Sequence, residues 1–67
     1  MRQVINDELR DIIRTMCMLG IDYYEIVNTD NDMIVAVSRE REQANIIRDE
    51  LNKKYSTVNF KVNFINN

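Results

Sequence analysis

Apolar residues in the first part of the chain recur with the spacing of an amphipathic helix. Between about Val4 and Leu19 they fall three or four positions apart, at Ile5, Leu9, Ile12, Ile13, Met16 and Leu19. This spacing gathers them into one stripe and leaves the charged residues on the other side. Gly20 follows where a left-handed residue can end a helix, and Ile21 can then contact Met16. The pattern predicts a helix over residues 4–19 with a glycine cap.

A second apolar stripe predicts another helix further along the chain. Its members are spaced for one helical face and are Ala44, Ile47, Leu51 and Tyr55. Ser38 is a favourable N-cap residue, so we expect this helix to run from Arg39 to about Lys54.

Three other segments are predicted to be strands. The first two, residues 23–28 and 33–37, flank a polar turn at Asp30 and Asn31, where positive φ angles are tolerated. The third alternates from Val58 to Phe64, with every second residue apolar. The pattern therefore predicts a β-hairpin and a separate final strand.

The register of the hairpin follows from its turn. A two-residue loop and a four-residue loop both give the same pairs on one face, Asn28–Met33, Ile26–Val35 and Tyr24–Val37. The pairs on the other face are then Tyr23–Ser38, Glu25–Ala36 and Val27–Ile34. We expect the first face to form the core, because the second would bury the carboxylate of Glu25.

These elements predict one α+β domain over residues 1–67, a two-layer αββαβ fold. We expect a three-stranded sheet with two helices packed on one face. The crossover through the second helix should make the third strand parallel to the second. The pattern alone leaves open whether the third strand lies beside the first strand or the second.

Composition narrows the chemistry. The chain has no histidine and a single cysteine, Cys17, so an internal disulfide and a cysteine-cluster zinc site are excluded. Nine basic against 11 acidic residues give a net charge of −2, which argues against general binding to nucleic-acid phosphates. The unpaired thiol and the lack of an apolar export signal or membrane span lead us to expect a cytoplasmic location.

Three groups of residues were candidates for chemistry, and each has a simpler structural interpretation. The oxygen-rich segment 28–32 resembles the start of a calcium loop but lacks its glycine and its final glutamate, so a polar turn fits better. Cys17 has no histidine to activate it, and we expect a buried or half-buried packing residue. The acidic residues on the helices alternate with arginines as on a solvated face. We therefore expect no catalytic residue, no cofactor and no metal.

A three-stranded sheet covered on one side leaves its other face for a partner. In the expected register that face carries Tyr23, Val27, Ile34, Ala36 and Lys61. The sequence thus favours a non-enzymatic protein-interaction module, an adaptor or inhibitor that self-associates or binds another protein, and its many asparagines would suit a phage or plasmid gene. The alternative is a small protein that binds single-stranded nucleic acid on the same face.

Overall fold

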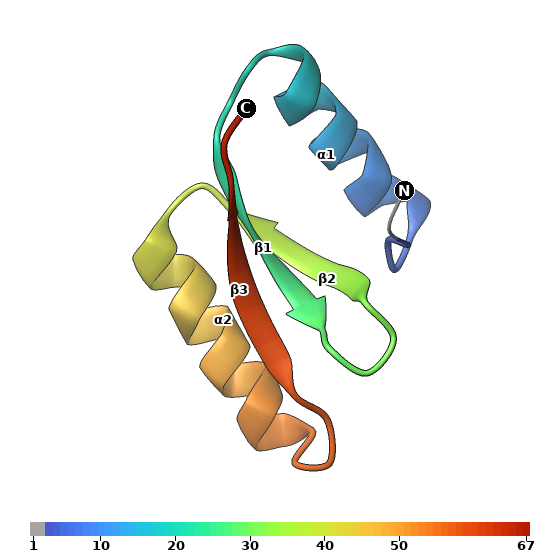
Figure 1. Ribbon diagram of the computed structural model, residues 1–67, viewed down its shortest axis with the longest axis vertical. Helices are drawn as coiled ribbons and strands as arrows, with labels where there is room; N and C mark the ends of the chain where they lie inside the picture. The colour runs from blue at the N-terminus through green and yellow to red at the C-terminus, as the bar shows by residue number, and fades with distance from the viewer. Residues whose placement is uncertain (1–2) are drawn as a thin grey trace.

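The computed structural model describes residues 3–67 and shows two helices and a three-stranded sheet in that part of the chain (Figure 1). The elements are α1 (Asp7–Met18), β1 (Tyr23–Asn28), β2 (Met33–Ser38), α2 (Arg41–Lys54) and β3 (Phe60–Ile65). The predicted α+β class and the order αββαβ are confirmed.

Both ends of α1 are fixed by local hydrogen bonds. At its start the side-chain oxygen of Asn6 accepts the backbone N–H of Leu9 at 2.8 Å, so the helix begins later than predicted. At its end Gly20 has a φ of 68°, and the N–H of Ile21 reaches the carbonyl of Met16 at 2.9 Å. The predicted glycine cap is therefore confirmed, and its bonds are those of a Schellman motif.

The start of α2 differs from the prediction. Ser38 is the last residue of β2, and its hydroxyl exchanges hydrogen bonds with the backbone N–H and carbonyl of Glu40, both at 3.2 Å. The helix then begins at Arg41, with Glu40 as an N-cap that makes no side-chain bond. Ser38 therefore stabilises the turn between β2 and α2 and is not the N-cap.

The order of strands in the sheet is β2-β1-β3, and β1 is antiparallel to both of its neighbours. The structure thus places the third strand beside the first. Since β2 and β3 both run opposite to β1, they run parallel to each other, as predicted. The central strand β1 is the most buried of the three, and its Ile26 and Val27 are fully buried.

The hairpin register is confirmed near the turn and is wrong beyond it. Asn28 pairs with Met33 and Val27 with Ile34, as expected. A β-bulge then shifts the register between Ile26 and Val27, and the pairs become Ile26–Ala36, Glu25–Val37 and Tyr24–Ser38. The bulge leaves Val35 as the extra residue on β2. The alternation of apolar residues could not show this, because β2 is apolar at consecutive positions.

The two helices lie on opposite faces of the sheet, which corrects the expected arrangement. Adjacent strand residues point to opposite faces, so full burial of both Ile26 and Val27 means that both faces of β1 are covered. On the face of Ile26, α2 packs against all three strands. On the other face, Ile13 of α1 lines a hollow together with Tyr23 and Ile34. The physical reason is that β1 carries large apolar side chains on both sides.

Candidate protein-interaction surface

The residues predicted to form an exposed patch do not form one. Tyr23, Val27 and Ile34 are only 4%, 0% and 6% exposed, because α1 lies on their face of the sheet. Ala36 is moved to the α2 face by the bulge, where it pairs with Ile26. Among the five predicted residues, Lys61 alone is exposed. The prediction that this face is open to a partner is therefore wrong.

Glu25, which the prediction placed in solvent, is 1% exposed on the same face as Tyr23. The side-chain amide of Asn63 on β3 donates a hydrogen bond to its carboxylate at 3.2 Å. A buried carboxylate with such bonds is a structural group of the sheet. The side chain of Glu25 also fills part of the space between α1 and this face of the sheet.

The other candidate groups adopt structural positions. The side-chain oxygens of Asn28 and Asn31 accept backbone N–H groups within the hairpin turn, at 2.9 and 3.1 Å. Cys17 is exposed, so the expected burial is wrong; α1 turns its neighbour Met16 toward the sheet instead. Within residues 3–67, no three acidic or cysteine side chains lie close enough to share a metal ion.

The outer edge of β3 is the most distinctive surface of the molecule. Just before β3, the carbonyl of Asn59 accepts the N–H of Thr29 at 2.9 Å. This bond shows which residues of β3 form hydrogen-bonded pairs with β1 and which do not. In an antiparallel pair only alternate residues bond to the partner strand. The backbone groups of Lys61 and Asn63 therefore point toward β1, and those of Phe60, Val62 and Phe64 point away from the sheet.

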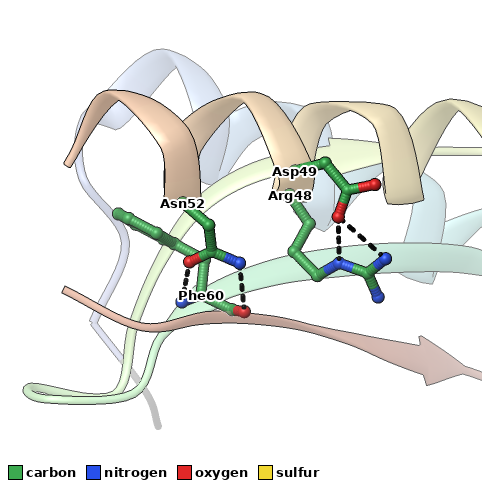
Figure 2. A network of polar contacts seen from close by, with 4 residues as sticks. All are labelled: Arg48, Asp49, Asn52 and Phe60. Carbon is green, nitrogen blue, oxygen red and sulfur yellow. Dashed lines mark hydrogen bonds and ion pairs between the residues drawn. The ribbon is translucent and has the colours of Figure 1, made fainter. Parts of the chain in front are cut away.

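Phe60 is the one outward-facing residue that has a partner in the described part of the chain. Its N–H donates to the side-chain oxygen of Asn52 at 2.8 Å, and the side-chain nitrogen of Asn52 donates to its carbonyl at 3.3 Å (Figure 2). The amide of Asn52 thus takes the place of a neighbouring strand at this point. Within residues 3–67 no backbone group bonds to the outward N–H and carbonyl of Val62 or Phe64. These four groups are called the β3 edge below.

One side of α2 runs beside the β3 edge. Residues spaced by one helical turn share a side of a helix, and the side that includes Asn52 consists of Arg41, Asn45, Arg48 and Asn52. These four residues are called the α2 flank. Asn52 of the flank reaches the outer side of Phe60, and Arg48 lies one turn away on the same side of the helix (Figure 2).

An apolar contact is available at the far end of the β3 edge. The ring of Phe64 is 53% exposed and lies 5.0 Å from the ring of Tyr24, centroid to centroid. Other exposed apolar residues lie elsewhere, at Ile5, Ile12, Met18, Leu19, Ile46 and Tyr55. The β3 edge therefore has polar residues of the α2 flank beside it and an exposed aromatic ring at one end.

A second hollow lies between α2 and the hairpin, with a volume of about 410 Å³. Its lining is almost wholly apolar and includes Met33, Leu51 and Phe60. Asn28 is its only amide side chain, so the hollow offers few polar groups that could orient a ligand. It is best described as loosely packed core.

Comparison of the chain with family models, curated proteins and solved structures finds no significant match. Within the described residues, neither helix has the length and apolar character needed to cross a membrane. The function is therefore argued from the geometry of the β3 edge and the α2 flank.

Proposed function

We propose that the protein is a non-enzymatic interaction module that binds an extended segment of a partner protein as an additional strand on β3. The observation that carries this proposal is the β3 edge, with two successive outward residues, Val62 and Phe64, whose backbone groups have no bond within residues 3–67. An added strand would satisfy all four groups at once. The exposed thiol of Cys17 suits a reducing, cytoplasmic setting for such a module.

The surroundings of the edge suit a bound segment. Strand addition draws its affinity from main-chain hydrogen bonds and its specificity from contacts of alternate side chains. Side chains on one face of an added strand would meet the α2 flank, and Phe64 would offer them an apolar contact. The edge also lacks the proline, bulge or covering loop with which proteins usually prevent such pairing.

A partner chain fits this edge better than a second copy of the same chain. Antiparallel pairing of two β3 strands around a two-fold axis would place both α2 helices on the same side of the joint sheet. The α2 flanks of the two copies, each with Arg41 and Arg48 and no carboxylate, would then face each other across the joint edge, and these like charges would oppose pairing.

Binding of single-stranded nucleic acid has less support. That hypothesis needed an exposed aromatic platform on the sheet, and Tyr23, its central residue, is buried.

A library of displayed ten-residue peptides tests the proposal. Val62→Pro removes the outward N–H of the β3 edge without removing a bond to β1. We expect peptides enriched on the wild-type protein to bind Val62→Pro at least about tenfold more weakly. In the wild type, the amide signals of Val62 and Phe64 should shift most when such a peptide is added in an NMR titration.

Val37→Pro is the matched control. Glu25, its partner in β1, has its backbone bonds directed to β3, so the N–H of Val37 also points outward, at the opposite edge of the sheet. This variant should keep the peptides, provided that circular dichroism shows both variants folded. Enrichment of no peptide, or equal binding by the wild type and a folded Val62→Pro, would contradict the proposed function.

A further inference from the structure

We infer that the segment bound at the β3 edge is acidic, and that Arg48 contacts a carboxylate on the residue that pairs with Val62. The inference rests on the proposed function, since it specifies the chemistry of the partner at the same edge. It follows from the distribution of charge around the edge and from the position of Arg48 on the α2 flank.

The charge around the β3 edge is opposite to that of the whole chain. The chain has a net charge of −2, yet after Glu50 it contains no acidic residue, and the one charged residue of β3 is Lys61. The α2 flank adds Arg41 and Arg48 and no carboxylate. Lys61 lies on the opposite face of β3 from Val62 and is exposed. Basic side chains therefore border the edge on both faces, and a segment bound there would be drawn in by complementary charge.

The position of Arg48 follows from the two hydrogen bonds of Asn52 and from regular helix and strand geometry. Asn52 bonds to Phe60, and Arg48 lies one helical turn before Asn52, at a rise of about 6 Å. Val62 lies two residues beyond Phe60, about 6.6 Å along β3. Since α2 and β3 run in opposite directions, Arg48 stands beside the outward groups of Val62. Figure 2 shows its side chain extending from α2 toward β3 on the same side as Asn52.

Arg48 has a guanidinium that can exchange partners. Its Nε and Nη2 atoms both lie 3.0 Å from one carboxylate oxygen of Asp49, the next residue along the helix. The side chain of Asp49 is 70% exposed, and an ion pair so open to water is weak. The side chain of Arg48 is half as exposed, at 34%. A carboxylate arriving along the β3 edge could bind the guanidinium with two parallel hydrogen bonds in place of Asp49.

The register of the bound segment is set by Asn52. Because Asn52 already occupies both backbone groups of Phe60, an added strand can pair only at Val62 and Phe64. The residue that pairs with Val62 shares its face of the sheet, and that face is covered by α2. Its side chain therefore points toward Arg48. An acidic residue at this position satisfies the backbone of Val62 and the guanidinium together.

Two synthetic peptides test the inference. One is a blocked, fluorescently labelled Thr-Val-Glu-Val-Glu-Val-Thr, and its twin has glutamine at both glutamate positions. By fluorescence anisotropy at low salt, we expect the wild type to bind the glutamate peptide at least about fivefold more tightly than its twin. The preference should shrink as salt is raised, because the charges are partly exposed.

Substitutions then locate the source of the preference. Arg48→Gln should reduce the ratio of the two affinities to about one, with affinity for the glutamine peptide unchanged. Lys53→Gln removes an exposed cation from another side of the same helix and should leave the ratio as in the wild type. Val62→Pro should abolish binding of both peptides.

The outcomes separate the inference from the proposed function. Equal binding of the twins, still abolished by Val62→Pro, would overturn the acidic partner and leave strand addition standing. A preference that survives Arg48→Gln would overturn the role of Arg48. Failure of the wild type to bind either peptide would overturn both the inference and the proposed function.

Discussion

The two outer edges of the sheet differ in how they are protected. At the β2 edge a backbone segment covers Ile34, beside the bulge, and leaves Val37 outward: the N–H of Ile34 donates to the carbonyl of Gln3 and its carbonyl accepts the N–H of Ile5, both at 3.0 Å. Val4 thereby forms a parallel bridge to β2. At the other edge, one side chain, Asn52, protects one residue, Phe60. Since exposed edges invite pairing with other chains, the difference indicates which edge is available for binding.

The difference also explains the contrast between the helices. Residues 3–5 cover the β2 edge, and residues 4–5 were predicted to belong to the first helix, so α1 is shorter than its apolar pattern predicts. α1 contacts β2 and buries only Met16, and Ile12 on its predicted stripe is 46% exposed. α2 instead packs along the whole sheet and reaches the β3 edge with its polar flank. The segment that covers Ile34 at the β2 edge is therefore not available to lengthen α1 and add to the core.

The largest expected effect comes from placing proline at each edge in turn. Ile34→Pro removes the bond to Gln3 and a side chain that is 6% exposed, so we expect it to lower the free energy of unfolding by about 3 kcal/mol or more. Val62→Pro breaks no bond within the chain and should cost about 1 kcal/mol. Urea unfolding followed by circular dichroism measures both.

If the two proline variants lowered the free energy of unfolding by similar amounts, the proposed difference between the two edges would be wrong. The outward N–H of Val62 would then be bonded in the folded protein. Ile34→Val separates the two parts of the larger loss. It keeps the backbone bond to Gln3 and trims one methylene, and we expect a cost of about 1 kcal/mol.

A smaller effect is expected from removing the side chain that protects Phe60. Asn52→Ala leaves both part-buried backbone groups of Phe60 without their partner and should lower the free energy of unfolding by about 1.5 kcal/mol. It also lengthens the β3 edge by one residue, so the peptides of the proposed function should bind more tightly, not less. Thermal unfolding and fluorescence anisotropy measure the two effects.

Asn45→Ala is the control on the same flank, and we expect it to change the free energy of unfolding by less than about 0.5 kcal/mol. If the two alanine variants were equally stable, the bonds of Asn52 to Phe60 would have no role in protecting the edge.

Much of the fold could be predicted from local pattern. The two helices, the alternation from Phe60 to Phe64 and the cap at Gly20 all depend on neighbours in sequence, and all were found. The bulge at Val35 was not, because β2 is apolar at consecutive positions and either register buries apolar residues. The opposite placement of the helices depends on which face of β1 each one covers, and no local pattern encodes that.

The candidate site was missed for a related reason. The sequence predicted a site from apolar side chains on an open face. The β3 edge consists instead of backbone groups, which every residue carries. Its polar neighbours Arg48 and Asn52 look like ordinary solvated helix residues until the fold brings Asn52 into contact with Phe60. One signal was available: the absence of acidic residues after Glu50 marks the last strand as basic in an acidic chain.

In the wild-type protein, hydrogen exchange of the backbone amides of β3 should also differ from residue to residue. In the unbound protein the amides of Lys61 and Asn63 donate to β1, whereas those of Val62 and Phe64 face outward. Hydrogen exchange followed by NMR should therefore alternate along the strand, with the outward amides exchanging on the order of a hundredfold faster. The amide of Phe60 also faces outward but is bonded to Asn52, and it should exchange slowly with the first pair. At the β2 edge Ile34 should likewise be slow, because Gln3 accepts its N–H. Slow exchange at Val62 and Phe64 in a dilute, monomeric sample would show that something in the chain already covers the edge, and the contrast between the two edges would be lost.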